Sequence, residues 1–95
     1  MSANYNEHSR AAEALFHHHA LDALCYLIEQ GRELEFTYHD QAYFLSTSQS
    51  TGYVSLWLGK KEEAYSSMDC FLQTALLQDT PFLVAWADVE LQYLL

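Results

Sequence analysis

Apolar residues recur at helical spacing through the first third of the chain. Residues 9–30 predict one long helix with Ser9 as its N-cap, and Gly31 occupies the left-handed position that commonly follows a helix. The polar residues 1–8 predict an N-terminal tail ahead of this helix. The residues expected on its apolar face are Phe16, Ala20, Leu21, Ala23, Leu24, Leu27 and Ile28.

After this helix the spacing of apolar residues changes from about 3.6 to about 2, which is typical of half-buried strands. Alternating runs predict strands over residues 34–38, 43–47 and 53–58, joined by the turn HDQA and by the loop STSQSTG. We expect them to form a three-stranded antiparallel meander. The pairs expected opposite each other are Tyr38 with Tyr43 and Phe36 with Leu45.

Two short helices are predicted in the C-terminal third. The first begins with Ser66 as N-cap and Asp69 three residues later, which is close to a capping box. The second begins with Thr80 as N-cap and Pro81 at the first helical position. The last seven residues, VELQYLL, fit a strand or a continued helix, and their alternation favours a fourth strand. These elements predict one small α+β domain over residues 1–95.

One face of the predicted meander carries aromatic side chains in place of polar ones. Phe44, Tyr53 and Trp57 are expected on this face. Glu35 and Ser46 flank them. Exposed aromatic patches commonly mark a contact site, so these three aromatic residues are the candidate interaction surface. The alternative is that the C-terminal helices cover this face and make it a second part of the core.

Negative charge is the clearest signal in the composition. Thirteen Asp and Glu residues face four Lys and Arg residues, which gives a formal net charge of −9. Such a surface repels phosphate, so direct binding of nucleic acid or of an anionic membrane is not expected, whereas a basic protein partner would be attracted. No apolar run approaches the roughly 20 residues that cross a bilayer. The N-terminus, MSANYNEHSR, lacks the pattern of a signal peptide, so we expect a cytoplasmic protein.

Three adjacent histidines in LFHHHALDALCYL raise the question of metal binding. Consecutive helical side chains spread over about 200°, so His17, His18 and His19 cannot all bind one ion. The weak candidates that remain are the i,i+4 pairs Glu13/His17 and His18/Asp22. Neither pair has an evident third ligand, so we expect no metal and no cofactor.

No catalytic residues are predicted, because the chain has neither a Gly-rich phosphate loop nor a G-x-S-x-G motif. An enzyme would need a concave pocket with His17, Glu13 or His39 at its centre. Cys25 and Cys70 lie far apart in apolar stretches and are expected to be two buried, reduced thiols.

Four segments occur one after another along the chain: EFTYHDQAYFLS, GYVSLW, SSMDCFL and TPFLVAWADVEL. Over residues 30–93 they resemble a group of small uncharacterised bacterial proteins. The shared pattern is F-x-Y, a polar turn, Y-x-[IL]-S, a Trp-bearing strand, a capped helix and a closing W-x-D-[VI]-E. The chain departs from it with His39, Asp40 and Gln41 where Asn-Gly is usual. The resemblance implies a bacterial α+β protein and no particular activity.

The sequence therefore favours a small acidic, non-enzymatic protein-interaction module, such as a regulator or an antitoxin- or immunity-like partner. One alternative is a small enzyme or metal-binding protein that uses the histidine-bearing helix. Another is an acidic DNA mimic whose carboxylates follow the spacing of phosphates. A homodimer is a further option, because an uncovered aromatic sheet face can pair with its own copy.

Overall fold

The computed structural model describes residues 7–95 of the chain and has an α+β architecture. Along this part of the chain the elements are α1 (Glu7–His18), α2 (Leu21–Glu29), β1 (Leu34–Tyr38), β2 (Gln41–Thr47), β3 (Val54–Leu58), β4 (Lys61–Tyr65), α3 (Met68–Thr74), β5 (Leu76–Leu77), β6 (Thr80–Pro81), α4 (Phe82–Ala85), a 3-10 turn (Trp86–Asp88) and β7 (Glu90–Leu94). The predicted α+β class is confirmed, whereas several of the predicted elements differ.

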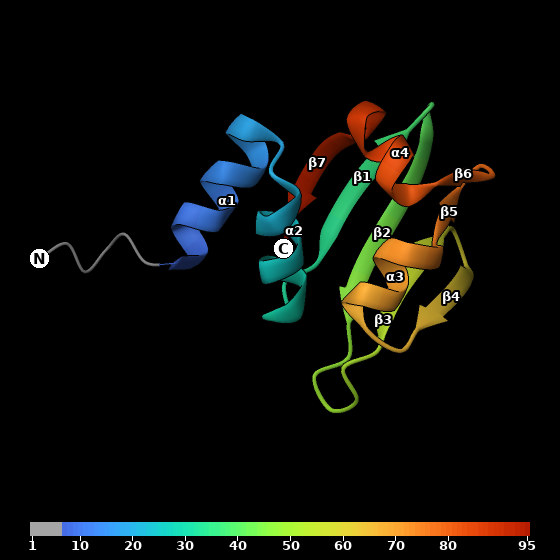
Figure 1. Cartoon of the computed structure of the whole chain (residues 1–95), viewed down its shortest axis with the longest axis horizontal. Coiled ribbons are helices and arrows are strands. Elements are labelled where there is room, and N and C mark those ends of the chain that lie inside the picture. Colours follow the sequence, from blue (N-terminus) through green and yellow to red (C-terminus); the bar gives the residue numbers. More distant parts are fainter. Residues whose placement is uncertain (1–6) are drawn as a thin grey trace, which may run out of the picture.

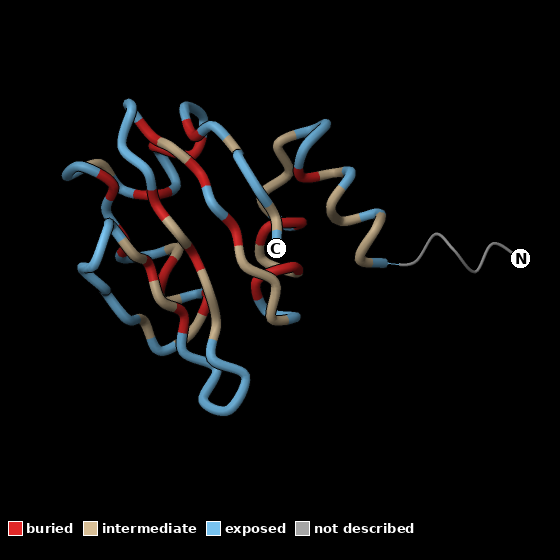
Figure 2. The backbone as a smooth tube through the Cα atoms, turned by 180° about the vertical axis from the view of Figure 1, so that it is seen from behind, coloured by how far each residue is buried: buried red, intermediate tan, exposed pale blue. Residues whose placement is uncertain are grey.

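Five strands form one antiparallel sheet in the order β4-β3-β2-β1-β7, and β5 pairs with β6 in a separate two-stranded ribbon. In Figure 1, α2, α3 and α4 lie on one side of this sheet, and α1 packs against α2. The opposite side of the sheet, seen in Figure 2, has no described helix across it. We call this uncovered side the outer face.

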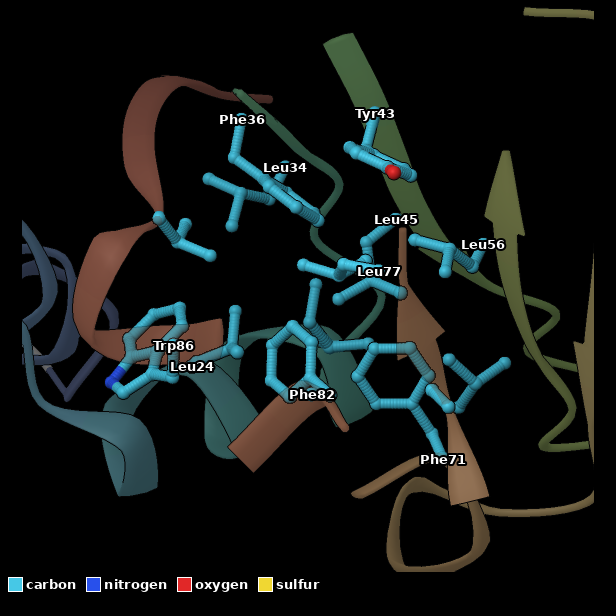
Figure 3. Close-up of a cluster of buried hydrophobic side chains, with 14 of the residues drawn as sticks. Leu24, Leu34, Phe36, Tyr43, Leu45, Leu56, Phe71, Leu77, Phe82 and Trp86 are labelled. Atoms are coloured by element: carbon cyan, nitrogen blue, oxygen red, sulfur yellow. The ribbon is translucent and has the colours of Figure 1, made fainter. Parts of the chain in front are cut away.

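The hydrophobic core lies between the sheet and the helices that cover it, as Figure 3 shows. Leu24 of α2, Phe71 of α3 and Phe82 of α4 approach the sheet from the helical side and are almost fully buried. The rings of Phe71 and Phe82 have centroids 4.7 Å apart. The inward strand residues labelled in Figure 3 are Leu34, Phe36, Tyr43, Leu45 and Leu56. Since side chains alternate along a strand, the residues between these reach the outer face.

The predicted single helix over residues 9–30 is wrong, because the chain forms two helices separated by His19 and Ala20. His19 has a φ of +54°, the left-handed conformation in which many helices end. Glycine is the usual residue there, although histidine is one of the side chains that tolerate it better than most. Ser9 lies inside α1 and is not its N-cap.

Tertiary contacts explain why the chain bends at this point. The ring of His19 stacks on Trp86 with the centroids 4.2 Å apart. His19 Nε2 donates to the carbonyl oxygen of Trp86 at 2.7 Å, and Trp86 Nε1 donates to the carbonyl oxygen of His19 at 3.2 Å. The bend also lets α1 pack on α2 and buries Leu15 completely. These contacts favour the bend over a straight helix, which would carry Leu15 away from the core.

The predicted end of the helical region is confirmed. Gly31 has a φ of +92° and its N–H donates to the carbonyl oxygen of Ile28 at 3.0 Å. The N–H of Arg32 donates to the carbonyl oxygen of Leu27 at 3.0 Å. This pair of hydrogen bonds is the Schellman motif, which satisfies the last carbonyl groups of α2.

The hairpin of β1 and β2 has the predicted faces but a different register. His39 and Asp40 have φ angles of +47° and +66°, which make a two-residue type I′ turn, so the residues after them already belong to β2. The observed pairs are Leu34 with Leu45, Phe36 with Tyr43 and Tyr38 with Gln41, in place of the predicted Tyr38–Tyr43 and Phe36–Leu45 pairs. The shift is two residues, so every side chain keeps its predicted face.

The meander has four strands rather than three, because β4 pairs with β3 after a turn at Gly59. The sequence of β4, KEEAY, has no apolar alternation and was not predicted to be a strand. Charged residues are common on edge strands, where they discourage pairing with other chains. The predicted C-terminal strand is confirmed as β7, which pairs with β1 and forms the opposite edge of the sheet from β4.

Two short helices are present in the C-terminal third, and both predicted N-caps are wrong. Ser67, not Ser66, caps α3, since its Oγ accepts a hydrogen bond from the backbone N–H three residues later at 3.0 Å. Thr80 and Pro81 form the strand β6, and the single-turn α4 begins one residue later. The pairing of β5 with β6 thus replaces the helical turns expected there.

Residues 1–6 of the predicted polar tail lie outside the described part of the chain, and the last two residues of that predicted tail, Glu7 and His8, belong to α1. Among the described helices, none has the length and apolar character that crossing a membrane requires.

Candidate protein-interaction face

Strand alternation brings one residue from each strand of the main sheet into a single row across the outer face. The pairs in register are Tyr93 with Glu35, Glu35 with Phe44, Phe44 with Trp57, and Trp57 with Glu62. We call these five residues the outer row. Residues directly opposite on antiparallel strands have Cβ atoms about 5 Å apart, so the outer row is a continuous strip from β7 to β4.

Three of the five side chains in the outer row are aromatic. Phe44 and Trp57 form a direct cross-strand pair in the middle of the sheet, and both are half-buried. Tyr93, on the edge strand β7, is 64% exposed. The strand neighbours of Phe44 and Trp57 include the buried core residues Tyr43, Leu45 and Leu56. Exposed aromatic groups gathered in this way are typical of contact surfaces.

All residues of the outer row except Glu62 line an open hollow of about 480 Å³ on the outer face. Its lining includes Glu35, Thr37, Phe44, Trp57 and Tyr93. Pockets that hold small ligands are commonly about 300–1,000 Å³. The hollow therefore has room for one or two side chains of a partner.

Carboxylates are the only charged groups at the outward positions of the described strands, and they are Glu35, Glu62 and Glu90. Glu62 accepts a hydrogen bond from the hydroxyl of Ser55, and Glu90 accepts one from the hydroxyl of Thr37 at 3.3 Å. Glu35 has no hydrogen-bond or ion-pair partner within residues 7–95. The outer face therefore combines aromatic rings with uncompensated negative charge.

The structure places two of the three predicted surface residues together. Phe44 and Trp57 are neighbours in the outer row, and the C-terminal helices lie on the other side of the sheet and do not cover them. Tyr53 is 48% exposed but precedes β3 and lies outside the outer row. Tyr93 was missed, because alternation within VELQYLL puts it on the same face as Leu91. The pairing of β7 with β1 shifts register between Glu35 and Phe36, so Leu91 packs against the core while Tyr93 is exposed. Recognising it required knowledge that this strand lies beside β1.

The weak metal candidates Glu13, His17, His18 and Asp22 are not brought together. The bend after α1 puts His18 and Asp22 on different helices, so they are no longer an i,i+4 pair of one helix. The side chains of His17 and His18 are both exposed. Within the described residues, no three His, Cys, Asp or Glu side chains lie close enough to hold one ion.

A second hollow, of about 470 Å³, lies on the helical side of the sheet near the ribbon of β5 and β6. Tyr43, Tyr65, Lys61 and Glu63 contribute to its lining. Burial raises the pKa of Tyr65 to about 12, and the hydrogen bond that its hydroxyl donates to Glu63 adds to this effect. Burial also raises the pKa of Tyr43. Both phenols therefore stay protonated at neutral pH.

The residues expected at the centre of an enzyme pocket lie elsewhere. Neither of these hollows, nor a third of about 310 Å³ between α1 and α2, is lined by His17, Glu13 or His39. His39 lies in the turn after β1, where its ring stacks on Tyr38 and its Nε2 is 4.0 Å from the carboxylate of Asp88. The observed geometry gives no support to catalysis by these groups.

Comparisons with protein-family models, with curated proteins and with solved structures found no match to this chain. The resemblance to small bacterial proteins therefore stays a prediction, and the geometry of the outer face is the basis for considering function.

Proposed function

We propose that this protein is a non-enzymatic interaction module that binds a basic surface of a partner protein through its outer face. The observation that carries the proposal is the outer row, with three aromatic and two carboxylate side chains on a sheet face that no described helix covers. Aromatic residues at the centre of a contact surface commonly supply most of the binding energy. Carboxylates around them favour a basic partner and speed its association. A regulator or an antitoxin- or immunity-like protein acts by this kind of binding.

A DNA mimic receives less support from the distribution of acidic residues. Such a protein needs its carboxylates along one surface, at the spacing of phosphates. Here they occur on both helical and strand elements, and the consecutive residues Glu62 and Glu63 of β4 point to opposite faces of the sheet. The outer face itself is interrupted by aromatic rings, which favour contact with protein.

Self-association through the outer face is also disfavoured. Two copies that met there would bring Glu35, Glu62 and Glu90 of one molecule close to the same three carboxylates of the other. No outward position of the described strands carries a base to offset this repulsion. We therefore expect a different protein as the partner.

The proposal is tested by comparing two alanine variants as baits for binding proteins from an extract of the source organism. Trp57→Ala removes the largest ring of the outer row, and Val84→Ala removes a side chain that is 67% exposed on α4, on the other side of the sheet. A retained protein is then purified and titrated against each variant. We expect Trp57→Ala to weaken binding by about 2 kcal/mol or more, which is roughly thirtyfold, because central aromatic residues are common hot spots. We expect Val84→Ala to leave the affinity unchanged.

Hydrogen exchange of the purified complex supplies the second measurement. Binding should slow exchange in β2 and β3 more than in α3 and α4. Equal effects of both variants, or protection confined to the helices, would contradict the proposal. So would a stable homodimer in sizing chromatography that shields Trp57 from a fluorescence quencher.

A further inference from the structure

We infer that the outer row is a binding site for an arginine side chain of the partner, with Glu35 as the residue that receives the guanidinium group. This inference rests on the proposed function and specifies the chemistry that the outer face recognises. It comes from the order of side chains in the outer row and from the hydrogen bonds of its carboxylates.

The order of the outer row places a carboxylate between aromatic rings. Glu35 on β1 lies directly opposite Tyr93 on one side and Phe44 on the other, and Trp57 follows Phe44. Since each step across the sheet is about 5 Å, a group that contacts the carboxylate of Glu35 also lies within reach of a ring face. A cation held there gains from both the carboxylate and the rings.

The three outward carboxylates differ in what they already bind. Glu62 and Glu90 accept hydrogen bonds from Ser55 and Thr37. Glu35 accepts none from the described residues, so both of its oxygens are open to a partner. A carboxylate with two open oxygens can accept the paired N–H groups of a guanidinium.

Arginine fits this arrangement better than lysine for three reasons. Its guanidinium is planar, so it can stack on Phe44 or Trp57 while it forms paired hydrogen bonds with Glu35. It is less strongly hydrated than an ammonium group, which matters because the hollow is open to water. Its aliphatic stem can lie along the rings, and the hollow of about 480 Å³ leaves room for the whole side chain.

The other two outward carboxylates favour additional basic residues in the partner, next to the bound arginine. Glu62 lies at the β4 end of the outer row, and Glu90 lies two pairs along β7 from Tyr93, opposite Thr37. Both are exposed and would attract further basic residues on either side of the bound arginine. We therefore expect the partner segment to carry several arginines.

The test uses the full chain and three short peptides of the same length, with blocked ends, that alternate glycine with arginine, lysine or citrulline. Citrulline has nearly the shape of arginine without its charge. Binding is followed by NMR through amide shifts and the indole signal of Trp57. We expect the arginine peptide to shift the signals of Glu35, Phe44, Trp57 and Tyr93 in a saturable way. We expect the lysine peptide to bind at least about threefold more weakly and the citrulline peptide to give no saturable shift.

Two variants with the same change in net charge separate recognition from general attraction. Glu35→Gln should weaken binding of the arginine peptide by about fivefold or more, because it removes an ion pair next to the rings. Glu29→Gln, at an exposed position on α2, should leave the affinity within about twofold. The same spectra show whether each variant keeps its fold.

The inference is overturned if the arginine and lysine peptides bind equally, if both variants weaken binding equally, or if no signal of the outer row shifts. These outcomes do not decide the proposed function. If the arginine peptide fails while a partner still depends on Trp57, the outer face binds proteins through other chemistry. If Trp57→Ala leaves partner binding intact, the proposed function itself fails.

Discussion

The two cysteines, which the sequence predicted to be buried, reduced thiols, have different surroundings. Both are half-buried and unpaired. Burial raises the pKa of the Cys25 thiol, and the nearby carboxylates of Glu29 and Asp22 add to this. The pKa of Cys70 is lowered, first by its interaction with the hydroxyl of Thr74, whose oxygen lies 3.9 Å from the sulfur. The two thiols should therefore differ in reactivity.

We predict that iodoacetamide modifies Cys70 faster than Cys25 at neutral pH, because the thiolate is the reactive form and is more populated at the lower pKa. Mass spectrometry of peptides after timed exposure measures both rates in the same sample. Thr74→Val removes the hydroxyl and should slow the reaction of Cys70 without changing that of Cys25. A faster reaction at Cys25 in the native protein would contradict this prediction.

The three adjacent histidines also differ from one another at the residue scale. His17 and His18 are exposed at the end of α1, and only His19 is built into the fold. Its role is to hold Trp86 by a stacked ring and two hydrogen bonds. The three histidines therefore differ in their contribution to packing, because the left-handed backbone at His19 turns its ring toward the C-terminal part of the chain.

At the scale of elements, the bend between α1 and α2 depends on this contact. We predict that His19→Ala lowers the free energy of unfolding by about 2 kcal/mol, from the loss of the stacked ring and of its hydrogen bond. His17→Ala and His18→Ala should each change it by less than about 0.5 kcal/mol, as is usual for exposed positions. Urea unfolding followed by circular dichroism measures all three variants. Equal small effects would show that the contact with Trp86 does not stabilise the bend.

Strand positions that carry apolar residues in alternation were predictable from the sequence. β1, β3 and β7 appear close to their predicted bounds, and Gly31 ends the helical region as expected. The charged strand β4 was not predictable in this way, since its place is set by pairing with β3 through the turn at Gly59. The bend at His19 was missed for a similar reason, because its cause is a contact with Trp86, far away in sequence.

The candidate site was predictable only in part. Phe44 and Trp57 share a face by simple alternation, so the sequence identified them. Their position beside Glu35 and Tyr93 depends on the order of strands in the sheet, which brings the C-terminal strand next to β1. Periodicity along one segment does not reveal that order. The register shift of β1 against β2 by two residues also changes which residue faces Phe44 without changing any face.

At the scale of the whole molecule, two tyrosines with raised pKa values, Tyr43 and Tyr65, link stability to pH. The pKa of Tyr65 is raised from 10.0 to about 12, and that of Tyr43 is raised by burial. A raised pKa means that the folded state holds the phenolic proton more tightly than the unfolded state. The unfolded chain therefore binds fewer protons above about pH 10, and stability falls as pH rises from there to about pH 12.

We predict that the urea midpoint of the native protein decreases over this alkaline range. The urea midpoint of Tyr65→Phe should decrease less steeply with pH. A pH titration of the folded protein, followed by the absorbance of tyrosinate, should show one fewer tyrosine with a raised pKa in the variant than in the native protein. Identical slopes for the two proteins would show that Tyr65 ionises equally easily in the folded and unfolded states.

Because the described helices cover one side of the sheet, core packing and the proposed recognition use opposite sides of the same strands. Inward residues determine the packing, and outward residues such as Phe44 and Trp57 are partly exposed to solvent. Selection can therefore alter the outward set with little penalty to the core, so that relatives with the same backbone could acquire different binding preferences. A combinatorial library that varies only outward positions should yield many well-folded members, and this scaffold would then be a starting point for engineered binders.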